Sequence, residues 1–378
     1  MEIDNAMRRQ ALSIPELLEQ QYADLEPKTR TVCTFEEIFS FQNIVIVGCG
    51  DSRFAGMAVK RTFEKLTGMR TEVMSAIDFS RFYPAGKLGT APNNPLVIIV
   101  SKSGTVARIS ESAQRARKHG AFVLGVTGNP ESPLGLNSSR ILKLDIPKFE
   151  SAPGVRSYLV SLTALTLFAI RLGEVRGKYT MDEAKSMRKD MKALAISLME
   201  ALPAIDSRMM DLAGAWKEME AFDFIGAGPD EAAAQYGQAK AFEAAGKYAS
   251  VVNTEEFMHL NCFMRKVDKI GTVLICGSES PALSRAKEVA EVIVNDLKRP
   301  SLIITDKEGV FDVPAENLIV VPKPAYEINS PMSVFLPVAF LMADIMALAG
   351  EESGRGLKDN WAFCQNAAGL KNSEIVIM

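Results

Sequence analysis

The feature that most constrains the fold is a set of short apolar segments that recurs in both halves of the chain. In the first half the segments are 44–47, 96–100 and 122–126, followed by Gly48, Ser101 and Thr127. In the second half they are 222–225, 273–276 and 302–304, followed by Gly226, Gly277 and Thr305. The residues that follow matching segments are 178, 176 and 178 positions apart. This near-constant spacing predicts a duplicated α/β unit.

The composition of the segments predicts how each unit folds. Continuous β-branched and apolar residues are typical of parallel strands that helices cover on both faces. Helical spacing of apolar residues predicts helices at 106–119, where Gly120 follows as a stop signal, at the Ala-rich 231–246 and at 179–212. We therefore expect two tandem doubly wound, flavodoxin-like parallel sheets. The expected order is a helical segment at 1–35, domains at 36–178 and 215–349 joined by a helix at 179–214, and a tail at 350–378.

Composition excludes several classes of function. Lys plus Arg number 43 and Asp plus Glu 46, so no large basic field exists to attract nucleic acid or an anionic membrane. The five cysteines form no Cys-x-x-Cys pair, which argues against a disulfide framework and a structural zinc site. The polar first ten residues are not a signal peptide, and no apolar run reaches the roughly 20 residues of a membrane span. We expect a cytoplasmic protein without a metal, a cofactor or a nucleic-acid or membrane partner.

The loops after the first two predicted strands of the first half are rich in glycine and hydroxyl groups. Ligands of open parallel sheets bind beyond the carboxyl ends of strands, where helix N-termini attract anions. Ser52 in one loop, and Ser101, Ser103 and Thr105 in the other, can donate hydrogen bonds to a phosphate. The alternative is that each hydroxyl only caps a helix. Gly48–Arg53 lacks the third glycine of a dinucleotide fingerprint and no P-loop is present, which disfavours a nucleotide-dependent dehydrogenase.

These two loops resemble those of the sugar-isomerase (SIS) domain family. The matching residues are Gly48-Cys49-Gly50-x-Ser52 and Ser101-x-Ser103-Gly104, each after a predicted strand. The family includes the isomerase half of glucosamine-6-phosphate synthase, tagatose-type ketose/aldose isomerases and deglycases of phosphorylated Amadori adducts. The resemblance implies two SIS domains and a sugar phosphate held by Ser101, Lys102 and Ser103, with Gly50 and Ser52 from the first loop. The family often has Thr two residues after the loop glycine, where this chain has Val106, with Thr105 one residue earlier.

Glu243 is the first candidate acid–base residue. It lies in the predicted helix 231–246 among Ala241, Phe242, Ala244 and Ala245. Apolar surroundings raise the pKa of a carboxyl group and suit it to proton transfer. The alternative is a solvent-facing carboxylate paired with Lys240 or Lys247.

His259 is the second candidate, and its residue pattern alone is also consistent with a buried or helix-end histidine. Relatives in the SIS family carry a catalytic Glu and, sixteen residues later, a His in a Glu-x-x-His segment, which Glu243 and Glu256–His259 match here. The resemblance implies that Glu243 moves a proton between C1 and C2 of the open sugar and that His259 assists ring opening. Glu256 either orients His259 or caps a local helix. Relatives continue His-Gly-Pro, whereas this chain continues Leu260-Asn261.

Three further residues follow from the same resemblance. Lys371 matches a tail lysine that contacts the open sugar and can form an imine, so the tail is expected to contribute to the active site. The alternative for Lys371 is a solvated side chain in a frayed terminus. Arg156 and Ser157 lie in a segment that resembles one closing the sugar site. In relatives the histidine reaches the neighbouring subunit, which implies a homodimer with shared active sites.

The sequence therefore predicts a phosphosugar aldose–ketose isomerase, or a related deaminase or deglycase, that uses a ring-opened hexose 6-phosphate derivative and an enediol-type intermediate. The alternative is a non-catalytic phosphosugar-binding regulatory protein. Glu243 and His259 separate the two possibilities, because a sensor needs neither a proton carrier nor a ring-opening group.

Overall fold

The computed structural model describes residues 3–89, 94–351 and 369–378, and the predicted tail 350–378 lies partly outside these ranges. The chain forms two units, named here repeat 1 and repeat 2, each built around one parallel sheet. Repeat 1 comprises Leu17–Lys148, Arg156–Met191 and Gly356–Met378. Repeat 2 comprises Met1–Glu16, Phe149–Val155 and Lys192–Arg355.

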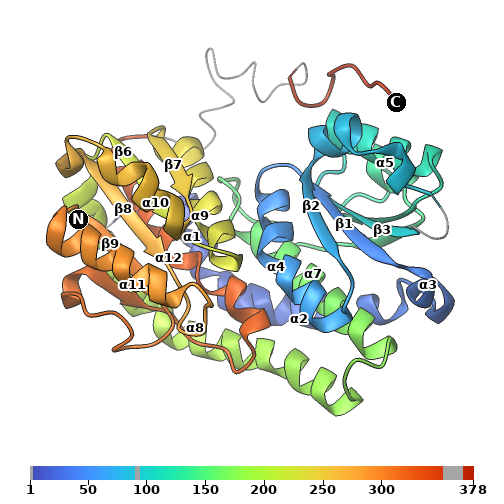
Figure 1. Cartoon of the computed structure of the whole chain (residues 1–378), viewed down its shortest axis with the longest axis horizontal. Helices are drawn as coiled ribbons and strands as arrows, with labels where there is room; N and C mark the ends of the chain where they lie inside the picture. The colour runs from blue at the N-terminus through green and yellow to red at the C-terminus, as the bar shows by residue number, and fades with distance from the viewer. Residues whose placement is uncertain (1–2, 90–93, 352–368) are drawn as a thin grey trace. The chain divides into compact units, whose positions relative to one another are not determined.

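Repeat 1 contains a five-stranded parallel sheet in the order β2-β1-β3-β4-β5 (Figure 1). Its strands are β1 (Asn43–Gly48), β2 (Thr71–Ser75), β3 (Pro95–Val100), β4 (Phe122–Thr127) and β5 (Arg140–Lys143). The helices that begin in or near it are α2 (Ile14–Thr31), α3 (Phe35–Ser40), α4 (Asp51–Thr67), α5 (Ala107–Lys118), α6 (Pro133–Leu136) and α7 (Arg156–Val175). Every residue of β3 is buried, as expected of an apolar strand between two layers of helices.

Repeat 2 contains a second five-stranded parallel sheet in the order β10-β9-β8-β6-β7. Its strands are β6 (Ala221–Ile225), β7 (Tyr248–Val252), β8 (Ile270–Ile275), β9 (Ser301–Thr305) and β10 (Leu318–Val320). Its helices are α1 (Ala6–Leu12), α9 (Pro229–Lys240), α10 (Thr254–His259), α11 (Leu283–Glu291) and α12 (Leu336–Leu348). The helix α8 (Met181–Trp216) contributes residues to both units.

The two sheets have the same topology. In each, the first strand lies between the second and the third, which is the flavodoxin-like order 2-1-3-4-5. The predicted fold class, two tandem doubly wound parallel sheets, is confirmed. The short strands β2, β5, β7 and β10 lie at or next to the sheet edges and were absent from the sequence-based set.

Strand register corrects one of the predicted equivalences. Val45 of β1 pairs with Val97 of β3, and Asp223 of β6 pairs with Thr272 of β8. The first strands are therefore 178 residues apart and the third strands 175 residues apart. The predicted segment 273–276 ended at Cys276, but the corresponding strand, β8, ends at Ile275. Ser101 therefore corresponds to Cys276, and the earlier match of Ser101 with Gly277 was wrong by one residue.

The turn between the first strand and its helix needs glycine in both units. Gly50 and Gly228 have φ angles of 50° and 62°, which disfavour any residue with a Cβ. A Cβ added to Gly48 would lie 2.7 Å from the backbone carbonyl carbon of Ser52. One added to Gly226 would lie 2.7 Å from the backbone carbonyl carbon of Asp230. The same close contact at equivalent positions shows that the repetition extends to the backbone of the loops.

The predicted helix 231–246 is two elements. The α-helix α9 ends at Lys240, and a π-helical turn follows over Ala241–Ala245. Gly246, with a φ angle of 63°, ends this turn in a left-handed conformation. Hydrophobic periodicity does not distinguish an α-turn from a π-turn, so the sequence pattern predicted one helix. The π-turn carries Glu243.

Two helical segments, Arg156–Val175 and Glu327–Leu348, are long and apolar enough to span a membrane by composition. The structure buries 83% and 89% of the residues in their most apolar windows. Burial of this extent is typical of core helices.

An unpartnered carboxyl group lies in the core of repeat 2. Asp344 on α12 is fully buried, and neither of its carboxylate oxygens has a hydrogen-bond partner among the described residues. Burial raises the pKa of Asp344 to about 7, Asp206 adds to this effect, and Arg8 opposes it. Arg8 forms its own 2.6 Å ion pair with Asp206. The core of repeat 2 therefore favours the protonated form of Asp344.

We predict that Asp344→Asn changes the pH dependence of thermal unfolding. The folded-state pKa of about 7 exceeds the ordinary value of 3.8, so the folded protein binds the proton more tightly than the unfolded chain. This contribution to stability is present at low pH and is lost as the pH rises through about 7. The Tm of Asp344→Asn minus the Tm of the unmodified protein should therefore increase as the pH rises from about 4 to about 8.

Differential scanning calorimetry at several pH values measures this difference. Asp211→Asn on the exposed face of α8 is the control for the loss of one carboxylate. A Tm difference between Asp344→Asn and the unmodified protein that stays constant over the range would contradict the prediction.

Candidate functional site

The first two predicted loops meet at the carboxyl edge of the sheet in repeat 1. β1 and β3 are neighbours, with Val47 opposite Ile99, so the turn at Gly50 lies beside the loop Ser101–Thr105. Ser52, predicted in the first loop, is the second residue of α4. α4 starts directly after the first loop and α5 directly after the second. This is the switch point of the strand order, where doubly wound sheets form their ligand crevice. The tertiary structure therefore brings together the two loops that the sequence singled out.

Internal hydrogen bonds determine the shape of the Ser101–Thr105 loop. The Ser101 hydroxyl accepts a hydrogen bond from the Gly104 nitrogen at 3.1 Å. The Lys102 carbonyl accepts hydrogen bonds from the Gly128 nitrogen at 3.0 Å and the Thr127 hydroxyl at 3.3 Å. Gly104 has a φ angle of 66°, and a Cβ there would lie 2.0 Å from the Ser132 hydroxyl oxygen. Only glycine fits at this position, which explains the Ser-x-Ser-Gly pattern.

This loop shape leaves hydrogen-bond donors available to a ligand. Among the described residues, the backbone N–H groups of Lys102 and Ser103 have no hydrogen-bond partner. The Ser103 hydroxyl oxygen accepts hydrogen bonds from the Thr105 hydroxyl at 3.2 Å and the Thr105 nitrogen at 3.4 Å, which leaves its own proton to donate. Thr105 thus contacts Ser103 directly. Two backbone donors and a hydroxyl at one edge of a sheet can bind an anion.

The first turn of α7 lies near the first of these loops. Arg156 is buried and Ser157 half-buried at its start. Burial, and secondarily the nearby Asp51, raise the pKa of the Tyr158 hydroxyl above its usual range. α7 packs against α4, the helix that begins at Asp51. Arg156 and Ser157 therefore belong to the same region of repeat 1 as Ser52.

The chain after residue 368 packs along α5. The Ala107 nitrogen donates to the Leu370 carbonyl at 2.8 Å, and the Val376 nitrogen donates to Glu111 at 2.8 Å. Lys371 is exposed between these two anchors. The side chain is solvated, as the alternative interpretation expected, but hydrogen bonds hold the backbone around it. Leu370 contacts Ala107, the first residue of α5 and two positions after Thr105, so the hydrogen bond brings the chain next to Lys371 close to the second loop.

Glu243 lies in repeat 2 and is paired with Lys240. The side chain of Glu243 is 49% exposed, whereas that of Lys240 is fully buried, and their charged atoms are 2.7 Å apart. The Lys240 ammonium also lies 4.9 Å from the centre of the Tyr236 ring. The alternative interpretation of Glu243, a carboxylate paired with Lys240, describes this geometry. A buried cation beside it fixes one carboxylate oxygen in place.

His259 is exposed at the end of α10 and is oriented by Glu255. Its Nε2 atom lies 3.0 Å from a carboxylate oxygen of Glu255, which also pairs with Arg285 at 2.8 Å. Arg285, and secondarily His259, lower the pKa of Glu255. The sequence pattern had offered Glu256 as the orienting residue. Spacing of four residues on a helix places Glu255 beside His259, while Glu256 gives its backbone N–H to the Asn253 cap at 2.8 Å.

The segment after His259, where this chain departs from the family pattern, is tied to the sheet by a buried ion pair. Asn261 donates to Asp223 at 3.0 Å and to Ser250 at 2.8 Å. Asp223 on β6 pairs with Arg299 at 2.7 Å, and Arg299 also donates to the Asn261 carbonyl. Sequence reasoning missed Asp223 and Arg299. An aspartate between Phe222 and Phe224 in an apolar strand was the available signal, because a buried carboxylate needs a partner.

The predicted residues thus fall into two groups. Repeat 1 holds the predicted phosphate-binding and sugar-contacting residues, which are Gly50, Ser52, Ser101, Lys102, Ser103, Thr105, Arg156, Ser157 and Lys371. Repeat 2 holds Glu243, Glu256 and His259. Within repeat 2, Glu243 precedes β7 and His259 follows it, and each contacts a different partner.

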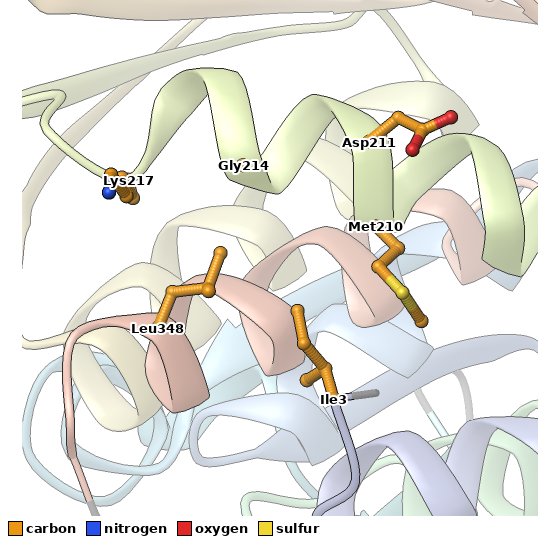
Figure 2. Close-up of a pocket in the computed structure, with 6 residues that line it drawn as sticks. All are labelled: Ile3, Met210, Asp211, Gly214, Lys217 and Leu348. Atoms are coloured by element: carbon orange, nitrogen blue, oxygen red, sulfur yellow. The ribbon is translucent and has the colours of Figure 1, made fainter. Parts of the chain in front are cut away.

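A pocket of about 360 Å³ lies elsewhere in repeat 2 (Figure 2). Side chains of α8, α12 and the N-terminal segment surround it, among them Met210, Leu348 and Ile3. None of the predicted site residues lines this pocket.

Comparison with known proteins agrees with the loop pattern. A family model described as SIS domain matches residues 37–171. The chain is 25% identical over 346 residues to the glutamine–fructose-6-phosphate aminotransferase (isomerizing) of Gloeobacter violaceus, covering 89% of this chain and 54% of that protein. The chain therefore spans about half the length of the curated relatives it matches.

Solved structures share the fold over nearly the whole chain. The C-terminal domain of glucosamine-fructose-6-phosphate aminotransferase from Francisella tularensis superposes with a TM-score of 0.81 at 18% identity, covering 93% of this chain and 98% of that one. Tagatose-6-phosphate ketose/aldose isomerase from Escherichia coli gives a TM-score of 0.73 at 15% identity, with coverages of 92% and 95%. Residues 37–171 therefore match a SIS domain, a second unit of the same topology follows them, and the chain is similar to the glutamine–fructose-6-phosphate aminotransferases over about half of their length.

Proposed function

We propose that this protein binds a hexose 6-phosphate derivative and catalyses its aldose–ketose isomerisation, or the related removal of an amine as a deaminase or deglycase. The observation that carries the proposal is the Ser101–Thr105 loop in the SIS domain. Its shape is set by internal hydrogen bonds, and it keeps two backbone N–H groups and a serine hydroxyl available at the switch point of the sheet. A phosphate group needs donors of this kind, held in place before it binds.

The chemistry needs a proton carrier and a ring-opening group. In the proposal, the Glu243 carboxylate removes the proton from C2 of the open-chain aldose and returns it to C1, through an enediol-type intermediate. His259 moves a proton between the ring oxygen and the anomeric hydroxyl during ring opening. If the substrate is an amine adduct, proton transfer from C1 to C2 by Glu243 converts it to the imine at C1. The Lys371 amine adds to C1 and the substrate amine leaves, and water then hydrolyses the lysine imine to the free aldose and regenerates Lys371.

The expected assembly is also part of the proposal. Relatives in the SIS family supply the histidine from a neighbouring subunit, so we propose a homodimer in the cytoplasm. The proposed steps use side chains of this protein alone. The phosphosugar is the only small-molecule partner in the scheme.

A ligand screen tests the substrate class. Hexose 6-phosphates, amino-sugar phosphates and phosphorylated fructosyl-amino acids are compared by thermal shift, with NAD as the control for the nucleotide-dependent alternative. We expect at least one phosphosugar to raise the Tm, because a ligand that binds only the folded state stabilises it. No shift with any phosphosugar, or a shift with NAD alone, would contradict the proposal.

Ser103→Ala tests the phosphate contact. A hydrogen bond to a charged group contributes about 1.5–3 kcal/mol, so the dissociation constant of the best phosphosugar should rise about 10-fold or more. Isothermal titration calorimetry measures the change, with Ser186→Ala on the exposed face of α8 as the matched control. Equal affinities of the two variants would place the phosphate elsewhere.

Glu243→Gln tests the proton carrier. General acid–base catalysis contributes roughly 10²–10⁴ in rate, so kcat on the best substrate should fall by about this factor while the phosphosugar still binds. Glu291→Gln at the exposed end of α11 is the control for a changed surface charge. Full activity in Glu243→Gln would remove Glu243 from the mechanism. Tight phosphosugar binding without turnover in the unmodified protein would instead support the regulatory alternative.

A further inference from the structure

Repeat 2 contains a counterpart of the proposed phosphate loop. The strand register makes Gly277 and Ser278 equivalent to Lys102 and Ser103, the two residues whose backbone N–H groups are available in repeat 1. The preceding residues confirm the match, because the Ser101 nitrogen donates to Val126 of β4 and the Cys276 nitrogen donates to Ile304 of β9, both at 3.0 Å. The loop in repeat 2 therefore begins with the same backbone geometry.

The difference lies in what these N–H groups contact. The Gly277 nitrogen donates to a carboxylate oxygen of Asp230 at 3.2 Å, and the Ser278 nitrogen donates to one of Asp306 at 2.6 Å. Both aspartates are buried, with exposed fractions of 9% and 8%. In repeat 2, two acidic side chains occupy the positions that a bound anion would take.

The residues at the equivalent positions in repeat 1 are small. Asp230 is the second residue of α9, and Ser52 is the second residue of α4, 178 positions earlier. Asp306 follows β9 directly, as Gly128 follows β4, again 178 positions earlier. The two loops therefore differ at two positions. Repeat 1 has Ser52 and Gly128 there and its loop donors are available, whereas repeat 2 has Asp230 and Asp306 and its loop donors are satisfied.

The surroundings in repeat 2 also resemble an anion site. The Lys323 ammonium lies 3.0 Å from the Ser278 hydroxyl and 2.7 Å from a carboxylate oxygen of Glu279. Burial, with Asp306 and Glu327 adding to its effect and the Gly277 N–H opposing it, raises the pKa of Asp230 to about 7. Such crowding of carboxyl groups is unfavourable, and the two backbone donors and Lys323 are the groups that offset it.

We propose that repeat 2 holds an internally occupied anion site, in which the carboxylates of Asp230 and Asp306 replace the oxygens of a phosphate. Removal of these carboxylates opens a second phosphate-binding site at Gly277 and Ser278. The unmodified chain consequently binds one phosphosugar, in repeat 1. This count of one and the test at Ser52 described below rest on the proposed function, whereas the contacts in repeat 2 are independent of it.

Two variants of equal charge test the proposal. The open variant combines Asp230→Ser, Glu279→Gln and Asp306→Gly, which restores the small residues of repeat 1 and releases Lys323 from Glu279. The filled control combines Asp230→Asn, Glu279→Gln and Asp306→Asn, which removes the same three charges but keeps an amide oxygen as acceptor for each N–H group. Inorganic phosphate is the probe, and isothermal titration calorimetry counts the equivalents bound per chain.

The open variant should bind one more equivalent of phosphate than the filled control. Equal counts in two folded variants would overturn the proposal. If the filled control and the unmodified protein bind no phosphate while the open variant binds one, the internal site stands and the proposed function of repeat 1 fails. If the unmodified protein and the open variant each bind one, the proposed function stands and the internal site fails.

A reverse substitution keeps the proposal testable if the open variant does not fold. Ser52→Asp places a carboxylate in repeat 1 at the position that Asp230 has in repeat 2. It should bind inorganic phosphate at least about 10-fold more weakly than Ser52→Asn, because its own carboxylate then contacts the Lys102 N–H group. Equal affinities of Ser52→Asp and Ser52→Asn would overturn the proposal.

Discussion

The need to satisfy backbone N–H groups at the end of the third strand is the constraint on which both units depend. An N–H group without an acceptor is costly, so each such loop needs an acceptor from the protein, from a ligand or, at exposed residues such as Lys102 and Ser103, from water. In repeat 2 the acceptors are Asp230 and Asp306. In repeat 1 the donors of Lys102 and Ser103 remain available, and we propose that a sugar phosphate is their acceptor. One fold thus meets the same requirement in two ways.

Buried ion pairs position the other candidate groups. Lys240, enclosed beside Tyr236, fixes the carboxylate of Glu243, and the pair of Asp223 and Arg299 ties the chain after His259 to the sheet. A buried charge without a partner is strongly destabilising, so each of these pairs restricts where its segment can lie. Ion pairs therefore restrain the segments that carry the two acid–base candidates. The strand order and register of repeat 2 bring the partners of these ion pairs together.

Much of the fold could be predicted from residue patterns. The central strands are continuous apolar runs, and the turn after β1 needs glycines at positions 48 and 50. The edge strands were missed because they are partly exposed and therefore carry polar residues, as in Arg140–Lys143. Of the candidate site, the phosphate loop was predictable because Ser101–Gly104 combines hydroxyl groups with a glycine that only a tight turn requires.

Residue patterns alone predict that two doubly wound units follow one another and that glycine- and serine-rich loops end their strands. Local patterns are sufficient for this, because periodicity and turn residues act over a few neighbouring positions. The i, i+4 spacing within α10 is local and places Glu255 rather than Glu256 beside His259. Contacts between distant residues come from the tertiary structure, as in the pair of Asp223 with Arg299 and the pair of Asp306 with the Ser278 nitrogen. The two partners in each of the latter pairs are separated by tens of residues, so their contact depends on strand order and register, which no local pattern specifies.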